Sequence, residues 1–200
     1  MPEPTDAFEL WVAQTTTQYL RVRDASLVEL QQQVLARKEA ALHRLYQLYA
    51  SDLEAKVRRL GPEATARAAE VVNDVFLRLP ETLVRYEEDG RFPAWLFTQA
   101  MNRWRTIRRS IRRDRLQGDG ELPPIIAPPS SVGVRIDRER LRAEAEARLS
   151  DTEREAWLLS LEGYSRQEIG DALGITANAA GVRLDRAKKR LRDLMHEYLR

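Results

Sequence analysis

A basic run in the middle of the chain is the first stretch whose side chains could do chemistry. The stretch NRWRTIRRSIRRDR, residues 102–115, holds seven arginines and a single acid, Asp114. Guanidinium groups bind phosphates through paired hydrogen bonds, whereas like charges along one helix face repel each other. A polyanion would relieve that repulsion and release counterions. The run therefore indicates a nucleic-acid surface, and a solvated charged face is the alternative.

Helical periodicity separates the side chains of residues 94–113 into two faces. One face is apolar: Leu96, Ala100, Trp104, Ile107 and Ile111. The opposite face is basic, with Asn102 at its edge: Arg105, Arg108, Arg109, Arg112 and Arg113. We expect one helix, from Pro93 to about Arg113, that packs inward and turns a band of guanidinium groups outward.

A second candidate site lies in residues 165–191, which have the pattern of a helix-turn-helix. Ser165 and Glu168 have the spacing of a capping box, Gly174 fits a left-handed turn, and Thr176 can cap the next helix. The second helix of such a pair enters the major groove, where its N-terminal side chains read base edges. Its outward positions are Asn178, Val182, Asp185, Arg186 and Lys189, with Gly181 beside them. A hairpin with a merely basic tail is the alternative.

The remaining elements are predicted to be helices as well. An apolar stripe runs from a capping box at Ser26 to Gly61, and a second helix runs from Pro62 to about Leu79. Residues 116–135 contain four of the nine prolines and three glycines, the composition of a linker. Ser150 and Glu153 form another capping-box pair.

These elements predict an all-α fold with two small helical domains, an N-terminal helical bundle and a C-terminal helix-turn-helix, joined by a flexible proline-rich linker. We expect an N-terminal extension over 1–23 and the first domain over 24–115. The linker then covers 116–136 and the second domain 137–200.

Composition argues against catalytic chemistry. The 200 residues carry a net charge of +2, no cysteine and two histidines that are far apart, so a thiolate metal site, a zinc site or a catalytic triad is not expected. No glycine-rich nucleotide motif is present. We expect no catalytic residue, no metal and no cofactor. No secretory signal and no membrane-spanning stretch is recognisable, which fits a cytoplasmic protein.

Three stretches together resemble the bacterial extracytoplasmic-function (ECF) sigma factors of the RNA polymerase sigma factor superfamily. AAEVVNDVFLRL (68–79) is similar to a helix of the family's second region, and FPAWLFTQAMNRWRTIRRSIRR (92–113) to its aromatic, asparagine and basic run. Residues 149–192, which include the helix-turn-helix, are similar to its fourth region. The resemblance covers about 40–115 and 138–195.

The resemblance implies a transcription initiation factor. Such a protein binds the clamp and flap regions of core RNA polymerase and carries the enzyme to promoter DNA. Its N-terminal module reads and opens the −10 element, its C-terminal module reads the −35 element, and the linker passes through the polymerase cleft. An anti-sigma factor is a further implied partner. The polymerase does the chemistry, so the protein is not expected to be an enzyme.

Residue roles are carried over by position. The resemblance assigns Asn73, Asp74 and Phe76 to core-polymerase binding. Residues implied for −10 DNA are Trp95, Asn102, Arg105, Arg108, Arg109 and Arg112, with Phe92 as a second aromatic. Residues implied for −35 DNA are Arg166, Thr176, Asn178, Gly181, Val182, Asp185, Arg186 and Lys189. Three places depart from the family pattern. The polymerase-contact pair, usually Gln-Glu, is Asn73-Asp74 here, and Val71 replaces an acid that is common just before it. Gly181 replaces a common basic residue in the reading helix.

Two other classes of protein fit parts of the pattern. A conventional dimeric helix-turn-helix regulator would bind duplex DNA without delivering polymerase, and it would have no use for a strand-binding helix. A helical interaction protein, with a coiled-coil-like segment over 26–60, is the other class.

Overall fold

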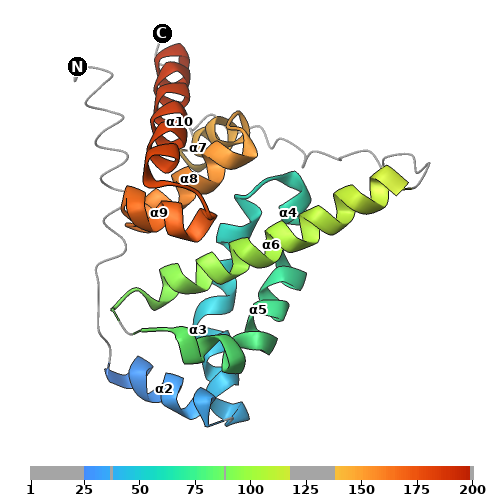
Figure 1. Cartoon of the computed structure of the whole chain (residues 1–200), viewed down its shortest axis with the longest axis vertical. Helices are drawn as coiled ribbons and strands as arrows, with labels where there is room; N and C mark the ends of the chain where they lie inside the picture. Colours follow the sequence, from blue (N-terminus) through green and yellow to red (C-terminus); the bar gives the residue numbers. More distant parts are fainter. Residues whose placement is uncertain (1–24, 37, 88, 118–137, 199–200) are drawn as a thin grey trace.

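The structure is a computed structural model that describes residues 25–36, 38–87, 89–117 and 138–198. All regular elements in these ranges are helical, which confirms the all-α prediction. The N-terminal group contains α2 (Ala25–Leu35), α3 (Glu39–Arg58), α4 (Pro62–Ala66), α5 (Ala68–Thr82), the 3-10 turn η1 (Leu83–Arg85) and α6 (Phe92–Gln117). The C-terminal group contains α7 (Arg138–Ala147), α8 (Asp151–Leu161), α9 (Arg166–Leu173) and α10 (Ala177–Tyr198) (Figure 1). The predicted extension over 1–23 lies outside the described residues, as does the linker apart from its first two residues, which end α6.

Two helices expected to be continuous are broken. The stripe from Ser26 to Gly61 is divided into α2 and α3, and α2 begins at Ala25, so Ser26 is not its cap. The charged stretch around Lys38 interrupts the apolar stripe, and the break lets α2 pack against α3, α5 and η1. The helix from Pro62 is likewise divided, because Arg67 leaves helical geometry at φ −121° and ψ 13°.

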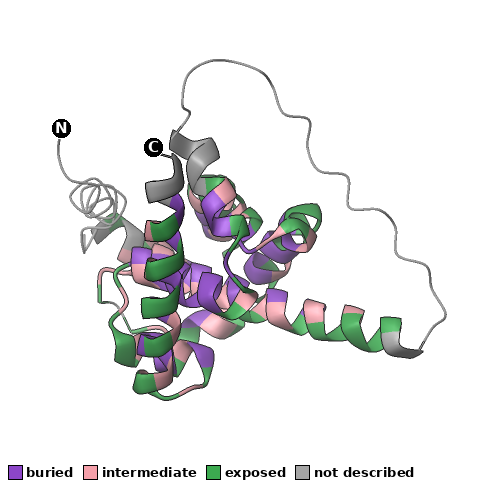
Figure 2. Cartoon of the chain, turned by 90° about the horizontal axis from the view of Figure 1, so that it is seen from above, coloured by how far each residue is buried: buried purple, intermediate pink, exposed green. Residues whose placement is uncertain are grey.

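The core of the N-terminal group lies where α3, α5 and α6 meet. The apolar face predicted for α6 is inward: Leu96, Ala100, Trp104 and Ile107 are buried and Ile111 is half-buried. The inward face of α5 is Val71, Val72, Val75, Phe76 and Leu79, all buried. Figure 2 shows the later turns of α6 projecting from this core, with exposed residues in green and half-buried residues in pink. The apolar face predicted for residues 94–113 is therefore confirmed.

Local signals at the C-terminal helices are confirmed in detail. Ser150 and Ser165 each accept a hydrogen bond from the backbone N–H three residues on, and the side chain of the glutamate there accepts one from the serine's own backbone N–H. Gly174 ends α9 in the left-handed region at φ 67°. The hydroxyl of Thr176 accepts a hydrogen bond from the N–H of Ala179 at 3.2 Å, which caps α10.

The two helical groups pack against each other, which the sequence did not predict. Lys56 on α3 and Glu162 after α8 form an ion pair at 3.0 Å, and both side chains are at most 5% exposed. Arg154 on α8 donates a hydrogen bond to the carbonyl oxygen of Leu60 at 3.1 Å. Arg59 donates two hydrogen bonds to the carboxylate of Glu146. A polar seam with buried charges therefore joins α3 to the C-terminal group.

Candidate nucleic-acid interface

The turn between α9 and α10 depends on Gly170. A Cβ at this position would lie 2.8 Å from the carbonyl oxygen of Ile175 and 3.1 Å from the backbone nitrogen of Ala177. Both atoms belong to the backbone, so no side-chain rotation can relieve the contact. Gly170 therefore lets the two helices approach closely enough to form a helix-turn-helix.

We expect Gly170→Ala to destabilise the C-terminal group by about 1–3 kcal/mol, the usual cost of overpacking. The melting temperature measures this loss, and binding to duplex DNA should weaken with it because α10 shifts relative to α9. Gly163→Ala is the control for glycine removal without crowding, since a Cβ there meets nothing within 4 Å and only its φ of +80° is strained. Wild-type stability of Gly170→Ala would contradict the close crossing.

The outward face of α10 is available for base contacts. Five of the predicted −35 residues are exposed there: Asn178, Val182, Asp185, Arg186 and Lys189. Val182 is 43% exposed and is the apolar member of this set. Such a residue can contact a thymine methyl group in the major groove. Thr176 is also exposed, but its hydroxyl is engaged in the cap.

Gly181 lies beneath the side chain of Arg166. Gly181 itself is buried, and a Cβ there would lie 3.3 Å from Cδ and from Nη1 of Arg166. The guanidinium of Arg166 in turn pairs with Asp185 at 3.1 Å. Arg166 of α9 therefore places a guanidinium group over Gly181 of α10. Sequence reasoning named both residues but missed their contact.

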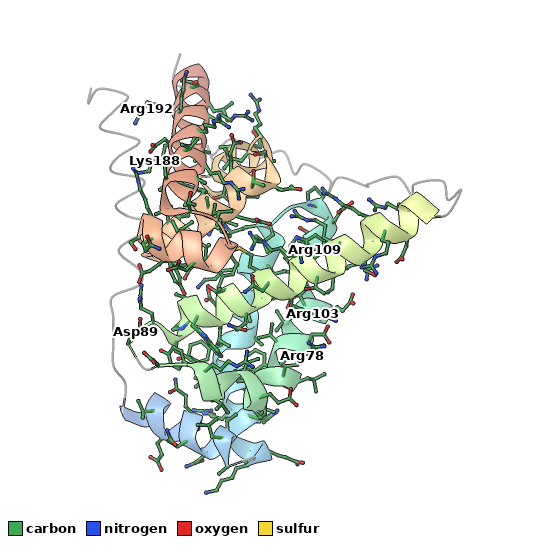
Figure 3. All side chains as sticks on the ribbon, viewed as in Figure 1. Arg78, Asp89, Arg103, Arg109, Lys188 and Arg192 are labelled. Carbon is green, nitrogen blue, oxygen red and sulfur yellow. The ribbon has the colours of Figure 1, made fainter. Side chains whose placement is uncertain are left out.

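The basic face of α6 is divided, which corrects the expected outward band. Arg109 and Arg113 are exposed, and Figure 3 labels Arg109 midway along α6. Arg105 and Arg108 are only 15% and 16% exposed, because both pack against α8. Their partner there is Glu155, which is 4% exposed. The sequence could not reveal this pairing, since Glu155 lies on a different helical group.

A hollow of about 210 Å³ lies between α5 and α6, and Asn102 is on its wall. Arg78 of α5 and Arg103 of α6 also line it, and Figure 3 labels both side chains. Nε of Arg103 donates a hydrogen bond to Oδ2 of Asp74 at 2.6 Å, which ties the two helices together. Asp74 was assigned to polymerase binding, and the structure places its carboxylate in this ion pair.

The aromatic residues near the start of α6 form a cluster. Trp95 is half-buried and stacks on Phe92 with ring centroids 5.8 Å apart. Its ring is also tilted against that of Tyr86, with the two centroids 5.0 Å apart. Phe92 is fully buried, so its suggested role in stacking on bases does not hold for this structure. Trp95, by contrast, is only partly buried.

Phe76 is a core residue in the structure rather than a surface contact. It is 3% exposed and packs edge-on against Tyr46 with centroids 5.0 Å apart. The hydroxyl of Tyr46 donates a hydrogen bond to Asn73, which is exposed. A partner protein can therefore contact the exposed side chains of Asn73 on α5 and Tyr46 on α3 directly. Phe76 lies buried behind them.

Two carboxylates at the seam between the groups have shifted pKa values. The hydrogen bond from Arg91, in the loop before α6, lowers the pKa of Glu168 to about 2. Burial raises the pKa of Glu162, and its partner Lys56 opposes that rise. Glu168 is therefore stabilised as a carboxylate, whereas the charge of Glu162 depends on Lys56.

The described ranges contain no candidate metal site, because no cluster of histidine, aspartate and glutamate in them could hold a metal ion. No helix in the described part of the chain is long and apolar enough to cross a bilayer.

Fold and site together define a helical protein that combines a helix-turn-helix with a separate arginine-rich helix. Comparison with known families gives the same division. Residues 45–115 match the family model "Sigma-70 region 2" and residues 144–191 match "Sigma-70, region 4". The chain is 34% identical to RNA polymerase sigma factor CarQ of Myxococcus xanthus over 135 residues, which is 66% of this chain and 76% of CarQ. It is 26% identical to ECF RNA polymerase sigma factor EcfG of Rhodopseudomonas palustris over 65% of this chain and 72% of EcfG.

The fold also matches a solved structure, that of the sigma factor RpoE in complex with the anti-sigma factor NepR from Bartonella quintana. The TM-score is 0.61 at 23% identity, over 77% of this chain and 96% of RpoE. The chain belongs to the ECF sigma factors. It is a transcription initiation factor that directs RNA polymerase to promoters, and the alternatives of a dimeric regulator and a helical interaction protein are set aside.

Proposed function

We propose that the two helical groups divide promoter recognition between them. Residues 24–115 form the module for the −10 element and for polymerase, and residues 137–200 form the module for the −35 element. The observation that carries this proposal is the hollow at Asn102, which adjoins the basic helix α6 and lies on the other helical group from the reading face of α10.

The −10 site is argued from α6. A base extruded from a duplex needs a pocket and a nearby surface for its phosphates. The hollow at Asn102 supplies the pocket, Arg109 supplies an accessible phosphate ligand, and the partly exposed ring of Trp95 supplies an aromatic contact for a base. Arg105, Arg108 and Arg112 are proposed as further phosphate ligands.

The −35 site is argued from α10. Asn178 and Arg186 lie on the exposed face of the second helix of a helix-turn-helix, where amide and guanidinium groups can bind base edges. Val182 offers an apolar contact, and Lys189 lies further along the same face for phosphate. Arg166 adds a guanidinium above Gly181, oriented by Asp185.

The polymerase surface is argued from α3 and α5. Leu77, next to Phe76 on α5, is 75% exposed, and Tyr46 and Asn73 lie close by. An exposed apolar side chain of this kind fits a protein–protein contact. We place the polymerase clamp on this surface, through Asn73 and Leu77, with Phe76 supporting Tyr46 and Asp74 fixing α5 to α6. The flap contact belongs to the C-terminal module.

The remaining parts of the function follow from the role of a sigma factor. The chain has no catalytic residue of its own, because the polymerase forms the phosphodiester bonds. It acts in the cytoplasm, where promoters and polymerase meet. An anti-sigma partner is supported by the similarity of the fold to RpoE, which was solved with the anti-sigma factor NepR.

The decisive experiment mixes the purified chain with core RNA polymerase and assays run-off transcription from genomic promoter fragments. Specific transcripts that depend on the added chain are expected. If the chain failed to bind core polymerase under every condition tried, the polymerase role would be refuted.

Two arginine variants separate the two DNA surfaces. Arg109→Ala should weaken binding of the holoenzyme to all promoters similarly and reduce the salt dependence of binding, because it removes a phosphate contact. Arg186→Ala should change discrimination at the −35 element by about 1–3 kcal/mol, because it removes a base contact. Binding to matched and mutated promoter fragments at several salt concentrations measures both. Uniform weakening by Arg186→Ala, or a loss with Arg109→Ala that is confined to one promoter, would reverse the assignments.

A further inference from the structure

Gly181 is a glycine inside a helix, and its backbone conformation does not require one. It lies in the first half of α10, and its φ is not in the left-handed region. A glycine within a helix destabilises it relative to alanine, because glycine loses more conformational freedom on folding. The three nearest atoms that a Cβ at Gly181 would meet all belong to Arg166 of α9, with Cδ and Nη1 at 3.3 Å and Cζ at 3.5 Å. The missing side chain therefore makes room for Arg166.

The guanidinium that fills this space is held by Asp185. Nη2 of Arg166 lies 3.1 Å from Oδ1 and 3.4 Å from Oδ2 of Asp185. Asp185 is four residues after Gly181, so the two positions share one face of α10. Asp185 is the one ion-pair partner of Arg166 in the part of the chain that the structure describes. A residue of the first helix of the helix-turn-helix is therefore fixed on the outward face of the second.

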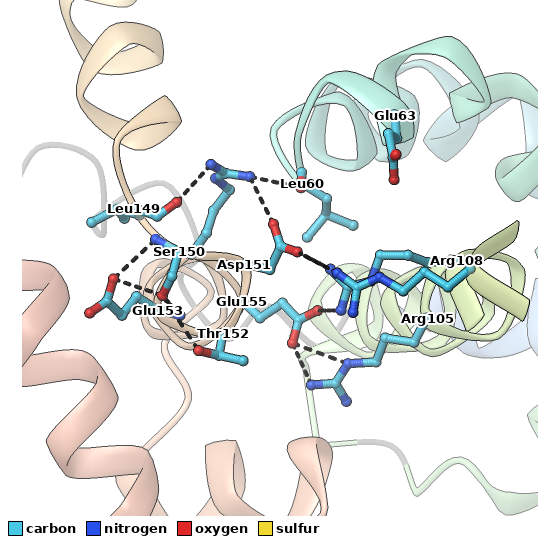
Figure 4. A network of polar contacts seen from close by, with 12 residues as sticks. Leu60, Glu63, Arg105, Arg108, Leu149, Ser150, Asp151, Thr152, Glu153 and Glu155 are labelled. Atoms are coloured by element: carbon cyan, nitrogen blue, oxygen red, sulfur yellow. Dashed lines mark hydrogen bonds and ion pairs between the residues drawn. The ribbon is translucent and has the colours of Figure 1, made fainter. Parts of the chain in front are cut away.

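The surroundings of Arg166 differ from those of the arginines of α6. Arg105 and Arg108 pair with the buried carboxylate of Glu155, and Figure 4 shows Glu155 pointing from α8 toward both. The side chains of Arg166 and Asp185 are each 60% exposed. An ion pair at this exposure contributes little to stability. Stability therefore does not account for the pair, whereas its place on the face available for base contacts does.

A guanidinium fixed in this way fits the edge of a guanine. Arginine donates paired hydrogen bonds to O6 and N7 of guanine in the major groove, and adenine has a donor where guanine has O6. When Nη2 donates to Asp185 it keeps a second hydrogen, so one edge of the planar fork stays open for such a pair. A mobile arginine could bind phosphates instead, and phosphate contacts carry no sequence information. The carboxylate of Asp185 therefore directs Arg166 toward the groove.

We propose that Arg166 reads a guanine of the −35 element and that Asp185 and Gly181 position it. Asp185 acts through Arg166 rather than on a base of its own, and Gly181 supplies the space that the side chain crosses. The inference rests on the −35 function proposed for α10, and it names the target of this part of the site, a G·C base pair. One base pair of the element is thereby read by both helices together.

The test uses the holoenzyme, assembled from core RNA polymerase and the full chain. The probe is a pool of duplex promoter fragments whose upstream element is randomised, and sequencing of the bound and unbound fragments gives the relative affinity for each base at each position. At one position the wild type should prefer guanine by about five- to hundredfold. Arg166→Ala should abolish that preference and leave the preferences at other positions in place. Arg166→Lys should do the same, because an ammonium group lacks the planar fork.

A matched control lies next to Arg166. Gln167 is the neighbouring exposed residue on α9, and its side chain donates a hydrogen bond to Asp171 rather than to α10. Gln167→Ala therefore removes a polar side chain from the same turn of α9 without touching the proposed base contact. Its preference at every position should match that of the wild type.

The positioning residues are tested by readouts that a structural role would not move. Asp185→Ala should lower the guanine preference roughly two- to fivefold in the wild type and leave Arg166→Ala unchanged, because Asp185 acts through Arg166. Its overall affinity should not fall, since a carboxylate is removed from a surface that faces phosphates. Gly181→Ala should also lower the guanine preference, although its melting temperature should equal or exceed that of the wild type, because alanine is the better helix former.

The outcomes separate this inference from the proposed function. If Arg166→Ala weakened all fragments alike and kept every preference, Arg166 would bind phosphate and the inference would be overturned. An effect of Asp185→Ala that persisted in Arg166→Ala would overturn it as well, because Asp185 would then bind a base itself. Full guanine preference in Gly181→Ala would overturn the role of Gly181. In all three cases selection of the upstream element by the holoenzyme would leave the −35 function standing, whereas a holoenzyme that selected no upstream sequence would refute that function itself.

Discussion

Lys56→Met is expected to lower the free energy of unfolding by about 3–5 kcal/mol at pH 7.5. The substitution keeps the volume and apolar stem of the side chain and removes only the ammonium group. Glu162, 3% exposed, would then keep a buried charge without its ion-pair partner. Urea unfolding followed by circular dichroism measures the change.

The effect of Lys56→Met should depend on pH. Burial raises the pKa of Glu162 above its ordinary value, and loss of Lys56 raises that pKa further. A carboxyl group whose pKa is raised on folding binds its proton more tightly in the folded state, so its cost appears as the pH rises above the ordinary value. The deficit of Lys56→Met should therefore shrink as the pH falls toward 5.

Two variants control this result. Adding Glu162→Gln to Lys56→Met removes the stranded charge and should restore most of the stability. Lys189→Met removes an exposed lysine of α10 and should change stability by about 0.5 kcal/mol or less. If Lys56→Met were no worse than Lys189→Met, the ion pair would not contribute to the packed state.

Arg154→Met is expected to lower the free energy of unfolding by about 3 kcal/mol or more, because each buried carbonyl that loses its donor destabilises the folded state by about 1–3 kcal/mol. The guanidinium donates hydrogen bonds to four carbonyl oxygens, those of Leu60, Glu146, Ala147 and Leu149. The last three oxygens belong to the C-terminal group, and the first belongs to the N-terminal group. The turn before α8 and the seam should both loosen, and thermal unfolding measures this loss of stability.

Arg154→Lys tests whether the shape of the guanidinium matters. A lysine keeps the charge but cannot reproduce the planar set of donors, so this variant should recover only a minor part of the loss. Arg190→Met is the control, because Arg190 also donates to a backbone carbonyl, that of Arg148 at 3.4 Å, but is 55% exposed. A cost below that of Arg190→Met would contradict the role assigned to Arg154.

The substitution Glu168→Gln should destabilise the protein less than Lys56→Met or Arg154→Met. Glu168 caps α9 and pairs with Arg91, and Glu168→Gln keeps the cap while it removes the charge. Because its side chain is a third exposed, solvent screening limits the expected loss to about 1 kcal/mol. The hydrogen bond from Arg91 holds its pKa at about 2 against an ordinary value of 4.5, so this contribution is present above pH 4.5 and is lost as the pH falls toward 2. Acid titration of stability should therefore show a smaller loss between pH 4.5 and 2 in Glu168→Gln than in the wild type.

The sequence by itself determined the features that depend on neighbours along the chain. The capping boxes at Ser150 and Ser165, the left-handed turn at Gly174 and the inward faces of α5 and α6 all follow from residues within a few positions of each other. These signals work locally because a helix cap and a helix face repeat over three or four residues. The family itself was recognised from a resemblance, that of residues 68–79, 92–113 and 149–192 to the regions of known sigma factors.

Only the tertiary structure decided which of these faces are accessible. Glu155 and Arg105 are 50 residues apart and Lys56 and Glu162 are 106 apart, and no periodicity connects such pairs. A charged side chain on a helix surface has the same local pattern whether it meets water or a counter-charge. The packing of separate helices therefore decides that Arg105, Arg108 and Phe92 are buried and that Arg166 covers Gly181. The contacts that set this packing are not visible in the linear order of residues.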